Sequence, residues 1–285
     1  MRVLLFGSSG FIGRQVRAAL APDAELICPG RDRYDLVHGD QAGLADVLRE
    51  AAPDAVVSCV GALTGSDEDL VRANTLVAAK LIGAAATAAP QARLVRLGSA
   101  GEYGVVAQGR SVSEDDRTEP VGAYGVSHLA GTRLFALAGG TSIRVFNPIG
   151  AGQPAENVLG RAAQRIRSAL ETGASEITLG PLGAYRDFVD VQDVASLIRA
   201  VVTAPQVPSR VYNCGSGNAV TVREAVGMLA AQAGWTGTIH EAGSGPQRSA
   251  AVTWIRAGIA RAATELGWRP AHDLSTSIKN IWAAA

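Results

Sequence analysis

The stretch Gly7-Ser8-Ser9-Gly10-Phe11-Ile12-Gly13 connects a short apolar run, Val3–Phe6, to an amphipathic run that continues to Leu20. In a glycine turn of this spacing, the first glycine permits the tight turn and the second lets backbone approach a pyrophosphate. The third lets helix and strand pack closely, and the N-terminus of the helix faces the phosphates. This strand–turn–helix order predicts a dinucleotide-binding turn. Its candidate contacts to the cofactor are Gly7, Ser9, Gly10, Phe11, Ile12 and Gly13.

Apolar runs of strand length alternate with helical runs through the first half of the chain. Strands are expected at Val3–Phe6, Glu25–Cys28, Ala55–Val60, Leu94–Leu97 and Ser142–Phe146. Helices are expected at Phe11–Leu20, Gln41–Glu50, Leu70–Ala88 and Ala123–Leu137. The strands show no polar alternation, which is typical of parallel strands covered on both faces. The pattern predicts an α/β fold of the Rossmann type, a doubly wound parallel sheet with helices on both faces.

The pattern changes after Asn147, where turns become frequent. Further elements are expected at Val158–Leu170, Phe188–Val202, Val211–Cys214, Ile259–Leu266, a helix capped by Thr221 and Glu224, and a last helix from about Asp273. We expect residues 1–150, completed by about 187–217, to form the cofactor-binding domain. Residues 151–186 and 218–285 are expected to form a smaller C-terminal substrate lobe over the carboxyl edge of the sheet.

The composition excludes several classes of function. Lys and Arg total 26, as do Asp and Glu, so the chain lacks the basic footprint of a nucleic-acid-binding protein. No run approaches the ~18–20 apolar residues of a membrane span, and the first residues do not form a signal peptide, so we expect a cytoplasmic protein. The cysteines Cys28, Cys59 and Cys214 are scattered and odd in number, which argues against a disulfide framework or a metal site.

The end of the second strand bears on the choice of cofactor. An acid there favours NAD, whereas a nearby arginine favours the 2′-phosphate of NADP. This strand ends Cys28-Pro29-Gly30-Arg31 without an acid, and the planar guanidinium of Arg31 suits a phosphate. We therefore expect NADPH to be preferred over NAD, the alternative being a solvated surface arginine. Asp40 is expected to accept a hydrogen bond from the adenine amino group, and Gly61 to leave room for a ribose.

Ser99 lies at the end of the fourth strand, in Gly98-Ser99-Ala100-Gly101-Glu102-Tyr103-Gly104, and Tyr124 follows twenty-five positions later in Tyr124-Gly125-Val126-Ser127-His128. Together with the glycine turn, these segments resemble the extended short-chain dehydrogenases/reductases, also called the NAD-dependent epimerase/dehydratase family. Later segments similar to motifs of that family are Arg144–Gln153, Leu179–Val191, Val211–Gly217 and Leu266–Pro270. The resemblance covers essentially the whole chain and is greatest toward reductases of GDP-linked 4-keto-6-deoxyhexoses.

The resemblance implies hydride transfer at a carbonyl group. In this family a serine hydroxyl polarises the carbonyl oxygen, and a tyrosine hydroxyl donates or removes the proton. A lysine four residues after the tyrosine lowers the tyrosine pKa and holds the nicotinamide ribose. By this likeness the candidate catalytic residues are Ser99, Tyr124 and His128, and Tyr124, His128 and Asn147 are also candidate cofactor contacts. The candidate substrate contacts are Ser99, Asn147, Gln153, Arg186 and Arg248.

His128 stands where the family has lysine. A cation near a tyrosine favours its phenolate, but histidine is mostly neutral at pH 7, so His128 is expected to activate Tyr124 only weakly. Three alternatives follow: Tyr124 remains the proton donor, the substrate supplies an acidic group of its own, or the site is inactive. His128 could equally be a residue on the surface of its helix.

Two further departures concern the substrate. Dehydratases of the family carry Glu two residues after the serine or threonine, where this chain has Gly101, which argues against elimination. The nucleotide-binding motif R-P-S-E-V is replaced by Arg248-Ser249-Ala250-Ala251-Val252, and Trp254 follows. Loss of polar anchors beside an aromatic suits a flatter, less charged ligand. The alternative is that Arg248 is solvated and Trp254 belongs to the core.

These features favour an NADPH-dependent ketoreductase acting on a bulky secondary metabolite, such as an aromatic polyketide in antibiotic biosynthesis. The first alternative is a nucleotide-linked 4-keto-6-deoxysugar reductase, and the second is a catalytically inactive NADP-binding regulator. The partner is expected to be a small-molecule ketone rather than nucleic acid or membrane. A homodimer through the helices at Leu70–Ala88 and Ala123–Leu137 is compatible with the resemblance.

Overall fold

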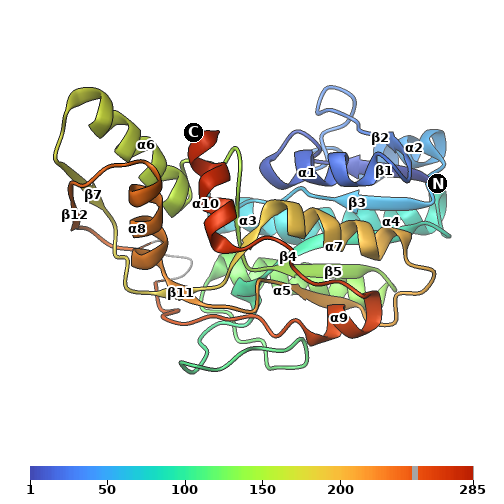
Figure 1. The fold of residues 1–285 in the computed structure, drawn as a ribbon. Coiled ribbons are helices and arrows are strands. Elements are labelled where there is room, and N and C mark those ends of the chain that lie inside the picture. Colours follow the sequence, from blue (N-terminus) through green and yellow to red (C-terminus); the bar gives the residue numbers. More distant parts are fainter. Residues whose placement is uncertain (246–249, 285) are drawn as a thin grey trace.

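The computed structural model describes residues 1–245 and 250–284. A six-stranded sheet lies at its centre in the order β10-β5-β4-β3-β1-β2, with all neighbouring strands parallel (Figure 1). Its strands are β1 (Arg2–Phe6), β2 (Glu25–Ile27), β3 (Ala55–Ser58), β4 (Arg93–Ser99), β5 (Thr141–Val145) and β10 (Val211–Cys214). Because β2 and β3 flank β1 on opposite sides, the glycine turn after β1 opens at the point where the strand order reverses, which is where such sheets bind ligands.

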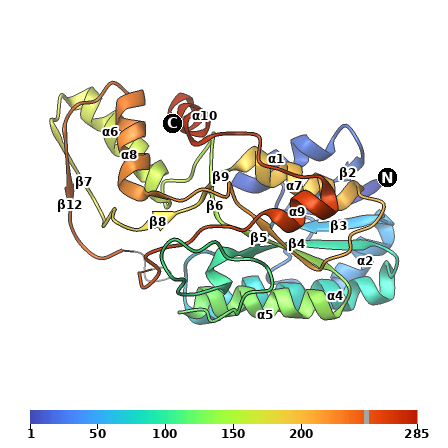
Figure 2. The ribbon, with the colours of Figure 1, turned by 60° about the horizontal axis from the view of Figure 1, so that its bottom comes forward.

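Helices cover both faces of the sheet, which confirms the expected doubly wound fold (Figure 2). Val3 and Leu5 of β1 pack with α1 and α7, whereas Leu4 and Phe6 pack with α2 and α4. Successive side chains of a strand point to opposite faces, so a strand buried on both sides must be apolar throughout. The helices around the sheet are α1 (Phe11–Leu20), α2 (Gln41–Ala51), α3 (Asp67–Val71), α4 (Val77–Ala88), α5 (Ala123–Leu137), α7 (Val191–Thr203) and α9 (Ala260–Leu266).

The helix expected at Leu70–Ala88 is interrupted in the structure. Between α3 and α4 the chain forms one turn of π-helix, Arg72–Leu76. The apolar periodicity that predicted one continuous helix does not reveal the extra residue that a π turn accommodates, and such turns are frequent at functional sites. The short strand β6 (Asn147–Ile149) is an addition to the predicted elements. It pairs in parallel, beyond the main sheet, with β9 (Phe188–Asp190), which begins the element expected at Phe188–Val202.

A second hydrophobic core lies beyond the carboxyl edge of the sheet, on the left in Figure 1. It is built by α6 (Val158–Thr172), β7 (Glu176–Leu179), α8 (Val222–Gln232), β12 (Thr238–Glu241) and α10 (Leu274–Ala283), beside the small antiparallel pair β8 (Tyr185–Arg186) and β11 (Val220–Thr221). Thr221 and Glu224 form the expected capping box of α8. Ala262 and Trp268, from the range 218–285 expected in this lobe, instead pack against the sheet. No helix of the described residues has the length and apolarity to cross a membrane.

Candidate active site

The glycine turn after β1 has the shape that a dinucleotide pyrophosphate requires. Gly7 adopts φ +76°, a conformation that side chains other than glycine rarely adopt. A Cβ at Gly13 would lie 1.9 Å from the carbonyl oxygen of Gly7, so only glycine lets α1 approach the turn this closely. Gly10 caps α1 without a side chain, so no side chain of the cap competes for the first N–H groups of the helix. The residues of this turn therefore fit the cofactor.

Near the position expected for adenine, the side chains of Asp40 and Lys80 form hydrogen bonds with the protein backbone. Asp40 caps α2, and its Oδ1 accepts a hydrogen bond from the Gly43 backbone N–H at 2.7 Å, a role other than the expected contact to adenine. Lys80 of α4 donates to the carbonyls of Leu36 and Val37 and so fixes the loop that precedes α2. Sequence reasoning missed Lys80, because a lysine within a helical run carries no local signal of this contact.

Arg31 lies exposed in the turn that follows β2. Asp32 comes next, and its carboxylate folds back over Gly30, where an added Cβ would lie 2.3 Å from Asp32 Oδ1. An arginine and an acid therefore both stand near the position that reads the 2′ group of the ribose in this fold.

Ser99 and Tyr124 both lie next to Gly101 at the carboxyl end of β4. Ser99 Oγ accepts a hydrogen bond from the Gly101 backbone N–H at 3.0 Å. A Cβ at Gly101 would lie 3.3 Å from Ser99 Oγ and 3.2 Å from Tyr124 Cε1, so this glycine separates the two side chains. The structure thus brings together the first two candidate catalytic residues, although they lie on different elements.

Glu102, one place beyond Gly101, does not supply a carboxylate to this site. It is fully buried, and its Oε2 accepts a hydrogen bond from Arg144 Nε at 2.8 Å. Its Oε1 accepts hydrogen bonds from the Ser99 backbone N–H and from Thr132 Oγ1. Glu102 therefore fixes the end of β4. Its carboxylate is occupied by these contacts, in agreement with the argument against elimination.

His128 is buried, so its interpretation as a surface residue of α5 is wrong. Its exposed fraction is 6%, and its ring lies edge-on to the Tyr124 ring with centroids 4.7 Å apart. Burial, with a smaller contribution from Arg96, lowers the pKa of His128 to about 3, so the ring is neutral at physiological pH. Among the described residues its Nδ1 has no hydrogen-bond partner, which suits a site that a ligand completes.

Gly61 and Asn74 face the same space as His128. A Cβ at Gly61 would lie 3.9 Å from His128 Cε1 and 3.1 Å from Asn74 Oδ1, so Gly61 keeps this space open. Asn74, in the π turn, is almost fully buried and exchanges two hydrogen bonds with the backbone of Ala62. Its Nδ2 also lies 3.1 Å from Ser127 Oγ. Sequence reasoning missed Asn74, whose one signal was an amide inside an apolar helical run.

The candidate substrate residues lie around the β6–β9 pair. Asn147 Nδ2 donates to the carbonyl of Asp187, and Gln153 Nε2 donates to that of Pro148. Gln153 Oε1 is buried without a partner among the described residues, and Arg186 is partly buried, with Nη1 donating to the carbonyl of Tyr185. Arg248 lies outside the described residues.

Trp254 is part of the core, which decides between its two interpretations. It is 8% exposed, its Nε1 donates to the carbonyl of Arg110 at 2.7 Å, and its ring packs against Tyr185. An indole held on both sides in this way offers no open face for a flat ligand. The sequence could not distinguish the alternatives, because Arg110 is 144 positions away along the chain.

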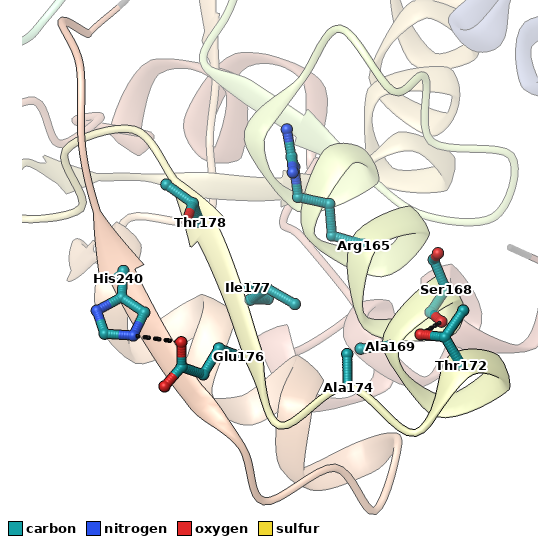
Figure 3. Close-up of a pocket in the computed structure, with 9 residues that line it drawn as sticks. All are labelled: Arg165, Ser168, Ala169, Thr172, Ala174, Glu176, Ile177, Thr178 and His240. Carbon is teal, nitrogen blue, oxygen red and sulfur yellow. Dashed lines mark hydrogen bonds and ion pairs between the residues drawn. The ribbon is translucent and has the colours of Figure 1, made fainter.

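A hollow on the outer side of the lobe lies between α6, β7 and β12 (Figure 3). Its polar lining includes Arg165, Thr178, and the ion pair between His240 and Glu176, with 3.4 Å between the nitrogen and oxygen atoms. None of Ser99, Tyr124 and His128 lines it. The hollow is therefore separate from the candidate active site.

Known proteins resemble the chain over almost its full length. Residues 3–215 match the model of the NAD dependent epimerase/dehydratase family. The dTDP-6-deoxy-L-talose 4-dehydrogenase (NAD(P)(+)) of Kitasatospora kifunensis is 34% identical over 99% of this chain and 95% of its own. The GDP-6-deoxy-D-mannose reductase of Pseudomonas aeruginosa is 31% identical over 98% and 95%.

Solved structures share the fold. RMD from Pseudomonas aeruginosa, complexed with NADPH, superposes with a TM-score of 0.85 and 26% identity, covering 100% of this chain and 98% of its own. MoeE5, in complex with UDP-glucose and NAD, gives a TM-score of 0.85 and 25% identity over 99% and 98%. Both similar structures thus hold a nicotinamide dinucleotide.

Proposed function

The chain belongs to the NAD dependent epimerase/dehydratase family, and we propose that it reduces the 4-keto group of a nucleotide-linked 6-deoxysugar with NADPH. The observation that carries the proposal is that Ser99 Oγ and the Tyr124 ring both lie beside Gly101 at the carboxyl end of β4. The substrate class is supported by the two relatives described above, whose names place them on dTDP- and GDP-linked 6-deoxysugars.

The aromatic polyketide expected as substrate lacks support. Trp254, which suggested a flat ligand, is packed in the core, and the replaced nucleotide-binding segment lies largely outside the described residues. The sugar nucleotide, which was the alternative, is therefore the better proposal.

The proposed reaction assigns a separate task to each polar group of the site. When bound, the reduced nicotinamide supplies a hydride to the carbonyl carbon. The Ser99 oxygen accepts a backbone hydrogen bond, which leaves its O–H able to donate to the carbonyl oxygen. Tyr124 gives the proton that converts this oxygen to a hydroxyl. Neutral His128 keeps one ring N–H with which to orient the nicotinamide ribose.

We further propose that Arg31 reads the 2′-phosphate, so that NADPH binds more tightly than NADH. Its exposed guanidinium can form two parallel hydrogen bonds to a phosphate. The choice of cofactor is supported by the similar solved structure that holds NADPH. Asn147, Gln153 and Arg186 are the proposed substrate contacts, because they lie between the sheet and the second core.

A homodimer is proposed through the outer face of α5. Leu137 is 87% exposed, and Val126 and Leu134 expose a large part of their apolar surface on the same helix. Exposed apolar side chains gathered in this way favour association with another surface. Light scattering tests the assembly: Val126→Arg together with Leu137→Arg should halve the mass of the particle, and an unchanged mass would exclude this face.

The test of function is turnover of purified protein with NADPH and a dTDP- or GDP-linked 4-keto-6-deoxyhexose, followed by loss of NADPH absorbance and by the product mass. We expect reduction of one of these sugars, and a loss of at least about 100-fold in kcat for Tyr124→Phe. An aromatic polyketide ketone serves as the comparison substrate. Turnover of that ketone alone would overturn the sugar-nucleotide proposal, and NADPH binding without turnover of either would favour the regulator.

A further inference from the structure

Arg96 is a buried cation to which the proposed reaction gives no task. It lies on β4, three residues before Ser99, and is 5% exposed. No carboxylate of the described residues lies within ion-pair distance of it, and Glu102, the buried acid nearby, is paired with Arg144 at 2.8 Å. The carboxylate of Glu102 thus pairs with Arg144 and not with Arg96. Burying an uncompensated charge is costly, and such groups are retained mainly where they serve function.

The guanidinium of Arg96 is hydrogen-bonded to the backbone of two residues of the candidate active site, His128 and Asn74. Its Nη1 donates to the carbonyl of His128 at 3.3 Å, and its Nη2 donates to the carbonyl of Asn74 at 3.0 Å. A Cβ at Gly131 would lie 2.9 Å from Nη2, so α5 has a glycine where the guanidinium needs space. Arg96 therefore joins the π turn to the helical turn that follows Tyr124.

We propose that Arg96 is a positioning residue of this reaction, whose fixed positive charge beneath α5 replaces the charge that His128 does not carry. The inference rests on the proposed reduction. As the Tyr124 O–H bond breaks, its proton passes to the carbonyl oxygen, while the carbonyl carbon accepts a hydride from the reduced cofactor. The electron pair of the O–H bond stays on the Tyr124 oxygen. The nearby cation stabilises this phenolate, since charges interact strongly in a buried environment.

The electrostatics of the neighbouring groups agree with this role. Burial lowers the pKa of Arg96 to about 10, so it remains charged at neutral pH, and interactions with Glu102 and, to a smaller extent, with Tyr124 act in the opposite direction. His128 stays neutral, as described above. The positive charge at this end of α5 is therefore that of Arg96.

The test reads the pKa of Tyr124 without any substrate. The wild type and each arginine variant are titrated to alkaline pH beside a second protein that also carries Tyr124→Phe. The difference in tyrosinate absorbance between the two proteins reports the ionisation of Tyr124 alone. We expect Tyr124 of the wild type to ionise below the ordinary value near 10. Arg96→Met should raise this pKa by about one unit and lower kcat about tenfold, with little change in KM. Arg96→Lys keeps the charge and should restore most of both effects.

Arg93→Met is the matched control. Arg93 lies on the same strand, and its Nη1 donates to the carbonyls of Val201, Val202 and Ala204, so its loss removes comparable structural contacts far from Tyr124. An equal pKa shift in Arg93→Met, or none in Arg96→Met, would overturn the proposal. A wild-type Tyr124 pKa at or above 10 would do so even if Arg96→Met does not fold. If no sugar nucleotide is reduced, the proposed function fails, while the titration still decides the role of Arg96.

Discussion

The His128 imidazole lies edge-on to the Tyr124 phenol one helical turn away, with ring centroids 4.7 Å apart and an interplanar angle of 62°. The residue at the position that carries lysine in the resembling family thus packs its ring against the ring of the proposed proton donor. A neutral ring can orient a ribose hydroxyl, but it cannot stabilise a phenolate by charge. This suits the direction of reduction, in which the phenol already carries the proton that it gives.

His128 should not titrate in the physiological range. Its pKa of about 3 means that the folded protein binds a proton less readily than the unfolded chain, so this residue lowers stability as the pH falls below 6.5. The chain has four histidines, and their imidazole proton signals can be followed by NMR. The signal that disappears in His128→Gln should keep its chemical shift between pH 5 and 8. A midpoint within that range would contradict the buried neutral ring.

His272 should have the opposite dependence on pH. Its Nδ1 lies 2.9 Å from Asp193 Oδ1, and this hydrogen bond is the main cause that raises the pKa of His272 above 6.5. The contribution to stability is therefore complete below pH 6.5 and is lost as the pH rises through the folded pKa. Urea unfolding at pH 5.5 and 8.5 measures the free energy of unfolding at each pH. Between these two values, the wild type should lose more of this free energy than His272→Gln does. His240→Gln, at the exposed pair with Glu176, is the control and should behave as wild type.

Glu102 should matter for stability far more than an exposed acid. Glu102→Gln leaves Arg144 buried without a countercharge, which costs about 3–5 kcal/mol when one partner of a buried pair is removed. Asp46→Asn breaks the exposed pair with Arg49 and should cost less than about 1 kcal/mol. Denaturant unfolding measures both. A similar loss of unfolding free energy in the two variants would contradict a buried ion pair between Glu102 and Arg144.

Arg31 should determine cofactor preference without affecting the fold. Arg31→Ala removes the guanidinium proposed to bind the 2′-phosphate, so NADPH binding should weaken by about 10-fold or more, while NADH binding changes little. Cofactor fluorescence titration gives both dissociation constants. Arg33→Ala, two residues along the same loop and also exposed, is the matched control. If Arg31→Ala weakened the binding of NADPH and NADH equally, Arg31 would be excluded as the residue that reads the 2′-phosphate.

Several features were determined by local sequence alone. The glycine turn, the doubly wound sheet, and the bounds of α1 and α5 follow from short-range patterns: glycine spacing, unbroken apolar strands and helical periodicity. The pairing of Ser99 with Tyr124 was expected from the family resemblance rather than from local patterns.

Tertiary structure decided what surrounds those residues. Whether His128 is exposed or buried, whether Trp254 faces a ligand or the core, and where the charge of Arg96 lies all depend on segments distant in sequence. Burial is a property of contacts, and a charge acts according to its distance from other groups and the dielectric between them. The sequence by itself therefore determined a nicotinamide-binding fold with a serine and a tyrosine at its edge. Only the folded chain decided that the histidine beside that tyrosine is buried, which keeps it neutral well below pH 7, and that a buried arginine lies close to it.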